Sequence, residues 1–213
     1  MKENLAVKMQ NIFPEQVSFY RVALLCHEAP EIGCGSRAKP ELLALERRSE
    51  VAQAWLNRTG TLIAIVWEKQ SSQASRGEVI RWLAKQVEIH PQELIGADYN
   101  SALKNFREGA DWYQGAAVNR LSEEEGGIIA ARLVRRLKAR TTLTDEQSRV
   151  LERAFTHIIQ RRLVHGSTKL VKTRHAGVES EIIKAARAHL NEQGILALQQ
   201  VFALGWYPLP NEK

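Results

Sequence analysis

The sequence has few cysteines, no long hydrophobic run and no recognisable catalytic motif. Two cysteines in 213 residues are too few for a disulfide framework, so we expect reduced thiols in the cytoplasm. The longest apolar run, Leu62–Trp67, is far shorter than the about 20 residues that cross a bilayer. The first residues carry no apolar segment followed by a small-residue cleavage site, so no secretory signal is expected. These absences predict a cytoplasmic protein without membrane insertion.

The net charge of +6 is unevenly distributed along the chain. Residues 1–100 carry 12 basic and 12 acidic side chains, whereas residues 130–175 carry 12 basic and 3 acidic ones. A local excess of this kind marks either a surface for a polyanion or a solvated helix face. The cations of this basic patch that would contact nucleic-acid phosphates are Arg132, Arg135, Arg136, Lys138, Arg140, Arg161 and Arg162.

The first ninety residues alternate between strand and helix patterns. Runs of β-branched, aromatic and aliphatic residues bounded by turn residues favour strands. Apolar side chains at helical spacing favour amphipathic helices, and Pro40 suits the first position of one of them. Strands are expected at 17–25 and 61–67, and helices at 41–56 and 76–87. We therefore expect an α+β domain over residues 1–94.

After residue 94 only helical patterns remain, which predicts an all-α domain over residues 95–213. Ser122 with Glu125, and Thr144 with Gln147, have the spacing of capping boxes that begin helices. Further helices are expected at about 178–191 and 195–204. This basic helical domain is also the expected surface for a protein partner or a second copy of the chain.

Both cysteines lie in the segment CHEAPEIGCGSRAKPELLALER, which begins at residue 26. Cys34 stands between two glycines and just before an expected helix, with Arg37 and Lys39 close behind it. A helix N-terminus, nearby cations and backbone N–H groups all favour the thiolate over the thiol. The same helix start, with Arg37 and Lys39, is also suited to a small anion.

Cys26 and His27 are the expected partners of Cys34, because the intervening loop can fold back on itself. Two sulfurs and one imidazole nitrogen suit a soft or borderline metal ion, Cu(I) or Zn(II). A redox or nucleophilic role of the Cys34 thiolate is a second interpretation. In a third interpretation, Cys26 is a small hydrophobic residue at a strand end and Cys34 is an unreactive loop thiol.

The segment IGCGSRAKPELLALERRSEVAQAWLNRTGTLIAIVW resembles the heavy-metal-associated domain of copper chaperones and metal-transporting ATPases. In that family a strand leads into a metal-binding loop of the form G-M-x-C-x-x-C, followed by a helix. Cys34 matches the first metal cysteine, whereas Arg37 stands at the position of the second. The resemblance implies a ferredoxin-like βαββαβ sandwich over residues 17–95, with the site in its first loop.

Together these patterns predict a ferredoxin-like domain followed by a helical domain. The expected function is non-enzymatic binding or handling of a soft metal through a loop with Cys34, Cys26 and His27. The alternatives are a nucleic-acid-binding or regulatory protein that acts through residues 130–175, and a thiol redox protein.

Overall fold

The computed structural model describes residues 12–86, 91–109, 111–165, 171–210 and 212, with the side chains of 171–176 left out. These residues form two compact units. The first unit consists of two stretches of the chain, the residues up to Cys26 and Glu31–Asn119. The second unit consists of His27–Pro30 and the residues from Arg120 onward. The expected mixture of helices and strands is confirmed. The domain boundary expected after residue 94 was wrong, because a further helix and strand follow it in the first unit.

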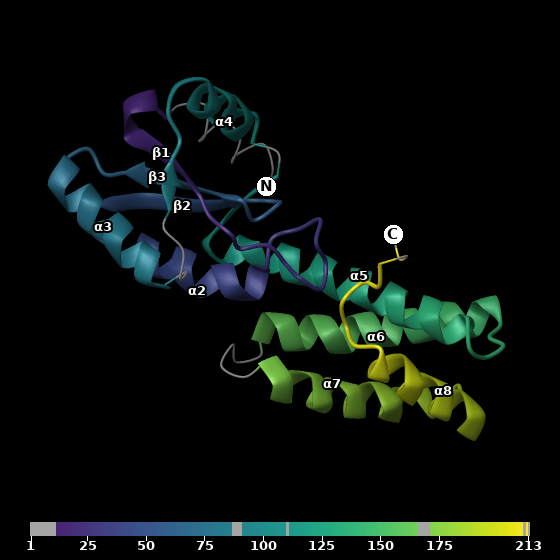
Figure 1. Cartoon of the computed structure of the whole chain (residues 1–213). Helices are drawn as coiled ribbons and strands as arrows, with labels where there is room; N and C mark the ends of the chain where they lie inside the picture. The colour runs from purple at the N-terminus through teal and green to yellow at the C-terminus, as the bar shows by residue number, and fades with distance from the viewer. Residues whose placement is uncertain (1–11, 87–90, 110, 166–170, 211, 213) are drawn as a thin grey trace. The chain divides into compact units, whose positions relative to one another are not determined.

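The first unit is built on a five-stranded antiparallel sheet with the order β4-β1-β3-β2-β5. Helices α2 and α3 lie on one face of this sheet, and α4 lies on the other (Figure 1). The strands are β1 (Val17–Arg21), β2 (Val51–Asn57), β3 (Leu62–Trp67), β4 (Gln92–Glu93) and β5 (Trp112–Gln114). The helices are α2 (Gly35–Glu46), α3 (Gln73–Gln86) and α4 (Gly96–Glu108), with short 3-10 helices at η1 (Pro14–Gln16) and η2 (Gly115–Val118).

Aromatic side chains fill the space between the sheet and α4. Phe106 of α4 meets Phe19, Trp55 and Trp112 edge-on, with ring centroids 5.1 to 5.8 Å apart. Such edge-to-face pairs add to the burial of apolar area. On the opposite face, four leucine and valine side chains of α2 and α3 are fully buried, namely Leu42, Leu45, Val79 and Leu83. The sheet therefore has an apolar layer on both faces.

The strand expected at 61–67 and the helix expected at 76–87 are confirmed to within a few residues. The single helix expected at 41–56 was wrong: α2 begins at Gly35 and ends at Glu46, and β2 occupies Val51–Asn57. Pro40 consequently lies inside α2. The apolar residues of 51–57 fit a helix by spacing, but pairing with β3 and β5 holds them extended. Non-local pairing thus overrides the local pattern.

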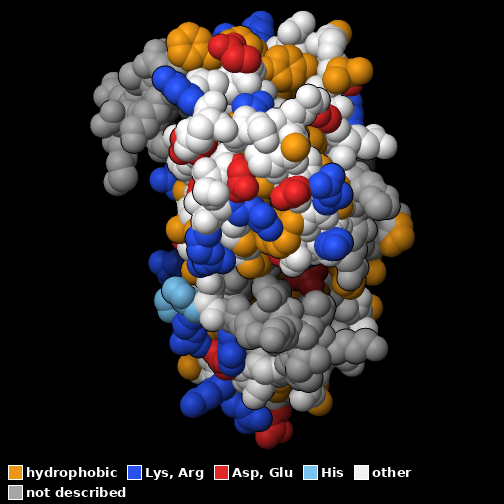
Figure 2. Space-filling model, turned by 90° about the vertical axis from the view of Figure 1, so that its left-hand side faces the viewer, with side chains coloured by type: hydrophobic (Ala, Val, Ile, Leu, Met, Phe, Trp, Pro, Cys, Tyr) orange, Lys and Arg blue, Asp and Glu red, His pale blue; other side chains and the backbone are white. Residues whose placement is uncertain are grey.

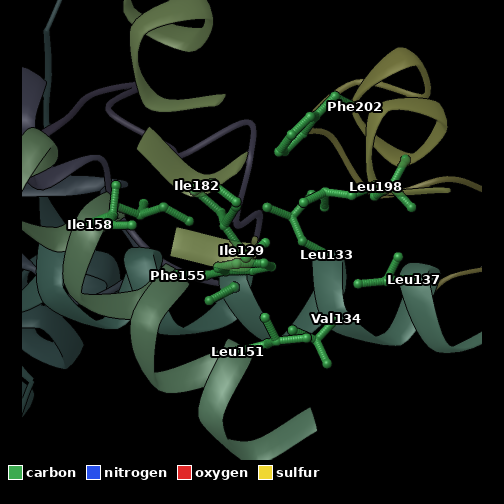
Figure 3. Packing of buried hydrophobic residues seen from close by; sticks show 14 of the residues in the cluster. Ile129, Leu133, Val134, Leu137, Leu151, Phe155, Ile158, Ile182, Leu198 and Phe202 are labelled. Atoms are coloured by element: carbon green, nitrogen blue, oxygen red, sulfur yellow. The ribbon is translucent and has the colours of Figure 1, made fainter. Parts of the chain in front are cut away.

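The second unit is helical, as expected for the C-terminal part of the chain. It comprises α5 (Asn119–Lys138), α6 (Asp145–His165), α7 (Val171–Ala186) and α8 (Glu192–Ala203). The first residue of α5, Asn119, still belongs to the first unit. In Figure 3, Phe155 of α6 lies beside Ile129 of α5 and Leu151 of α6 lies beside Val134 of α5, and Ile182 and Leu198 belong to the same core.

The two capping boxes expected in this unit have different outcomes. Thr144 and Gln147 form theirs: Gln147 N–H donates to Thr144 Oγ1 (3.1 Å), and Thr144 N–H donates to Gln147 Oε1 (3.0 Å). The box expected at Ser122 was wrong, since α5 begins at Asn119 and both Ser122 and Glu125 lie inside it.

None of the helices in the described part of the chain is both long and apolar enough to cross a membrane. The cytoplasmic location stays a prediction.

Candidate functional site

The segment between the two cysteines folds back so that its ends run antiparallel. The N–H of Cys26 donates to the carbonyl of Ile32 (2.9 Å), and the N–H of Cys34 donates to the carbonyl of Leu24 (2.7 Å). Leu25 and Gly33 form the β-bridge between these two hydrogen bonds. Residues 24–26 and 32–34 therefore act as a short ribbon that holds one cysteine on each strand.

This ribbon is attached to the turn between β2 and β3 through its backbone. Gly33 N–H donates to the carbonyl of Arg58 (2.7 Å), and Leu24 N–H donates to the carbonyl of Gly60 (2.9 Å). A Cβ on Gly33 would lie 2.8 Å from Gly60 Cα, and one on Gly60 would lie 2.4 Å from the carbonyl oxygen of Leu24. Gly60 also has a φ of 72°, which L side chains rarely adopt. The two glycines thus allow an approach that side chains would prevent.

The sequence of the β2–β3 turn, NRTGT, explains its rigidity. Asn57 Oδ1 accepts hydrogen bonds from the N–H groups of Thr61 and Leu62, both at 2.9 Å. Asn57 Nδ2 donates to the hydroxyls of Thr59 (2.9 Å) and Thr61 (3.0 Å). An asparagine that bonds the backbone of its own turn fixes that turn locally, so the ribbon with the cysteines rests on a stiff support.

Cys34 is the N-cap residue of α2, so its sulfur lies at the positive end of the helix. The side chain of Cys26 hydrogen-bonds to this sulfur, Ser36 Oγ lies 3.4 Å from it, and the backbone N–H of Arg37 also acts on it. These contacts lower the pKa of the Cys34 thiol to about 6. The hydrogen bond from Cys26 is the largest cause, and burial of the thiol opposes the shift. The surroundings of Cys34 therefore favour its thiolate form.

The two thiols are not joined in a disulfide, and both are buried: Cys26 is 3% exposed and Cys34 is 8% exposed. A thiolate next to a second thiol is a nucleophile with a neighbouring group that can react with its product. The sulfur pair is also a possible pair of ligands for a soft metal ion.

The structure does not assemble the expected three-ligand set of Cys34, Cys26 and His27. No three His, Cys, Asp or Glu side chains among the described residues are grouped so that they could hold a metal ion. His27 is exposed and belongs to the second unit, whereas both cysteines belong to the first. Only the two sulfurs of the expected set come together.

The two cations expected to bind an anion at the helix start, Arg37 and Lys39, differ in their exposure. Arg37 is the third residue of α2, and its side chain is exposed. Its charge favours the Cys34 thiolate. Lys39 lies two residues further along α2 and is half-buried. Arg37 thus acts on the sulfur site itself, whereas the binding of a free anion stays a prediction.

Two of the seven expected phosphate ligands are buried in the second unit. Arg132 Nη1 donates to the carbonyls of Glu28 (2.7 Å) and Trp206 (2.8 Å). Arg136 is 3% exposed at its side chain. It donates to the carbonyls of Gly205 and Tyr207 and forms a two-pronged ion pair with Glu212 at 2.6 and 2.8 Å. Both arginines hold the chain's own backbone and are unavailable to phosphates in this structure.

The other five residues lie on the surface, where most of them have partners within the chain. Lys138 pairs with Asp145 (3.1 Å), and Arg161 and Arg162 both pair with Glu181. Arg140 donates to the carbonyl of Arg136 (3.1 Å), and Arg135 is exposed. On the face shown in Figure 2, acidic side chains lie among the Lys and Arg side chains. These five residues keep a surface position, and nucleic-acid binding stays a prediction.

The role of Cys26 as a hydrogen-bond donor and the support from the β2–β3 turn are parts of the site that sequence reasoning missed. Ser36 follows Cys34 by two residues in the sequence, and its place in the first turn of a helix was the available signal. The turn at Gly60 had no such signal, because it approaches Gly33 only in the folded sheet. Comparison of the chain with models of protein families, with curated proteins and with solved structures found no match.

Proposed function

We propose that this chain is a thiol redox protein in which Cys34 is the reacting thiolate and Cys26 is the second thiol. The hydrogen bond from Cys26 to the Cys34 sulfur, at the N-terminus of α2, carries this proposal. It keeps the nucleophile ionised and places the second sulfur beside it. Such an arrangement is typical of thiols that cycle between dithiol and disulfide.

The oxidant that fits this site is a hydroperoxide. The Cys34 thiolate attacks the terminal oxygen, an S–O bond forms, the O–O bond breaks, and the departing oxygen takes up a proton from water. Cys26 then loses its proton to water and attacks the sulfenic sulfur, so that an S–S bond forms and hydroxide leaves. An external dithiol returns the two electrons. The 8% exposure of Cys34 favours a small oxidant over a folded protein substrate.

Mass spectrometry of the reduced protein after limited exposure to hydrogen peroxide tests this function. The wild-type chain is expected to lose two hydrogen atoms as it forms the Cys26–Cys34 disulfide. Cys26→Ser is expected to gain one oxygen at Cys34, because the second thiol is absent. Cys34→Ser is expected to react at least ten times more slowly than either. Equal rates for the wild type and Cys34→Ser would overturn the proposal.

A soft-metal site is a second candidate function, supported by the same adjacent sulfurs. Two thiolates are a sufficient ligand set for Cu(I), which accepts soft ligands in low coordination number. We expect one Cu(I) per chain to compete with a colorimetric chelator in the wild type. Loss of this binding in both Cys26→Ser and Cys34→Ser would support the site. Unchanged binding in either variant would remove it, independently of the result with peroxide.

We also infer that the first unit carries a ferredoxin-like βαββαβ module. In support, its elements follow the order β1-α2-β2-β3-α3-β4, and the strand neighbours run β4-β1-β3-β2. Strand β5 then pairs with the outer edge of β2. In this arrangement the thiol pair lies at the loop between the first strand and the first helix, as the resemblance to heavy-metal-associated domains implies.

A further inference from the structure

A hollow of about 760 Å³ lies in the first unit between α3 and the strands β1 and β4. Its volume is in the range of small-molecule sites. It is lined by Ser18 and Tyr20 of β1, Ser71 before α3, Gln73, Arg76, Gly77 and Ile80 of α3, Pro91, and Glu93 of β4. None of these residues belongs to the thiol site, so the hollow requires its own explanation.

One wall of the hollow carries a chain of hydrogen-bonded side chains. Trp67 Nε1 donates to Ser18 Oγ (3.1 Å), and the Tyr20 hydroxyl interacts with both Ser18 and Glu93. Tyr20 and Glu93 are directly opposite each other in the pairing of β1 with β4. Burial, the largest cause, raises the pKa of Tyr20 to about 12, so its hydroxyl keeps its proton at neutral pH. Tyr20 therefore donates to the Glu93 carboxylate and orients it.

The opposite wall presents a guanidinium group that is already held in place. Arg76 Nε donates to Ser71 Oγ (2.9 Å), Nη1 donates to the carbonyl of Glu15 (3.4 Å), and the guanidinium carbon lies 5.3 Å from the centre of the Trp67 ring. Stacking on an aromatic ring and a fixed Nε leave little side-chain entropy to lose when an anion binds. Arg76 thus offers a preorganised positive group on the lining of the same hollow as the carboxylate of Glu93.

Gly77 keeps the wall formed by α3 open. A glycine inside a helix costs about 1 kcal/mol relative to alanine. Among the described residues, the only atom that a Cβ on Gly77 would approach within 4 Å is Arg81 Nη1 at 3.5 Å, so space alone does not require glycine. A larger side chain at this position would instead project into the hollow that Gly77 lines.

We propose that this hollow binds a small zwitterion of the amino-acid type, with its carboxylate on Arg76 and its ammonium group on Glu93. Beyond the bonds to Ser71 and Glu15, the two Nη groups of Arg76 keep N–H donors that can bind a carboxylate in a two-pronged geometry. A carboxylate oriented by Tyr20 accepts hydrogen bonds from an ammonium group. A polyphosphate is disfavoured, because Glu93 would repel it. The mixed apolar and polar lining leaves room for a short side chain on the ligand.

Calorimetric titration of the full-length protein with glycine, L-alanine and L-glutamine tests this site, with acetate and methylammonium as single-charge controls. At least one amino acid is expected to bind with a Kd below about 1 mM, and at least tenfold more tightly than either control. Arg76→Gln and Glu93→Gln are each expected to weaken that binding at least tenfold. Arg76→Lys, which keeps the charge but loses the fork, is expected to weaken it less than Arg76→Gln.

Two further variants separate binding from folding. Lys85→Gln removes an exposed cation from the last turn of α3, and is expected to leave the affinity unchanged. Gly77→Leu is expected to abolish binding while the melting temperature stays the same or rises, because leucine favours a helix. Absence of binding by all three amino acids would overturn the proposal. So would acetate binding as tight as theirs, or equal loss in Arg76→Gln and Lys85→Gln.

Discussion

Cys34 owes its acidity to neighbours that come from two directions. The helix start, Ser36 and Arg37 follow it in the sequence, whereas Cys26 reaches it only through the folded ribbon. The local neighbours were visible in the sequence, so Cys34 itself could be predicted as the residue of interest. Cys26 was expected as a partner because the loop between the cysteines can fold back. The hydrogen bonds from Cys26 to Ile32 and from Cys34 to Leu24, which bring this about, are visible only in the structure.

Substitution of Cys26 by alanine is expected to raise the pKa of Cys34 from about 6 toward its ordinary value near 8.5. The reason is that the largest cause of the shift, the hydrogen bond from Cys26, is lost. The pH dependence of the rate of alkylation by iodoacetamide measures this pKa. Ser36→Ala is the matched control and is expected to give a smaller rise, because the Ser36 hydrogen bond is a smaller cause. An alkylation midpoint still near pH 6 in Cys26→Ala would contradict this account.

Arg132 and Arg136 are two residues whose position could not be predicted from the sequence. Their charge and helical spacing matched those of exposed cations, yet both are buried and bind backbone carbonyls. Those carbonyls belong to residues 28 and 205–207, which are far away in the sequence. An arginine in a basic run therefore cannot be placed at the surface until the course of distant segments is known.

The ribbon and the β2–β3 turn form one element whose geometry depends on Gly60. Gly60→Ala is expected to destabilise the protein by about 1–3 kcal/mol, because φ is positive and the new Cβ would strike the Leu24 carbonyl. Displacement of Leu24 would also disturb its hydrogen bond with Cys34, so the alkylation midpoint is expected to change. Urea unfolding and the alkylation profile measure the two effects.

Gly127→Ala is the control for this substitution. Gly127 lies inside α5, and an added Cβ there meets no atom of the described part of the chain within 4 Å. The expected result is a gain of up to about 1 kcal/mol, because alanine favours a helix over glycine. If the two alanine variants had the same stability, the proposed role of the close approach at Gly60 would be wrong.

The ion pair between Arg136 and Glu212 joins α5 to the last described residue. Arg136 lowers the pKa of Glu212 to about 2, mainly through their side-chain hydrogen bond. A carboxyl group whose pKa is lower in the folded state stabilises the fold above its unfolded pKa of about 4.3. That contribution decreases as the pH falls, and it is lost below about pH 2.

Glu212→Gln is therefore expected to remove part of the acid sensitivity of the second unit. The wild type should lose more unfolding free energy than the variant between pH 5 and pH 2, and should be the more stable protein at pH 7. Urea unfolding at pH 2, 3.5, 5 and 7 measures this difference, and Glu192→Gln at the exposed start of α8 is the control. Parallel pH profiles for the wild type and Glu212→Gln would contradict the assigned role of the pair.

The elements themselves were predictable where their signals were local. The capping box of Thr144 and Gln147 begins α6 as expected, because its four residues contain all the required groups. The same pattern at Ser122 failed, since α5 had already begun at Asn119. Strand β2 was mistaken for the end of a helix because its partners β3 and β5 lie elsewhere in the chain.

The division of the chain into two units follows from contacts that the sequence pattern does not contain. Strand β5 has only three residues, and it belongs to the first unit because it pairs with β2. Helix α4 looked like the start of the helical domain, but its Phe106 lies in the core of the sheet. The position of a boundary depends on such pairings, whereas the overall change from mixed to helical structure was visible in the sequence.

Each unit has a hydrophobic core of its own, so a core substitution is expected to act mainly on the unit that contains it. Phe155→Ala should cost about 3–5 kcal/mol in the second unit. The Cys34 thiol of the first unit becomes fully accessible to alkylation at a certain urea concentration, and Phe155→Ala should not change that concentration. Phe106→Ala, in the core of the first unit, should lower that concentration. If both variants lowered it equally, the two units would unfold as one.

The second unit includes four residues, His27–Pro30, that lie between the two cysteines of the first. Arg132 binds the carbonyl of Glu28 within this insertion. A gene fragment that begins after residue 30 would therefore lack part of the helical unit, and one that ends at residue 119 would carry that part without its arginine. No single recombination breakpoint yields both units intact, so exchange of whole domains during evolution would have to transfer the thiol pair and the helical unit together.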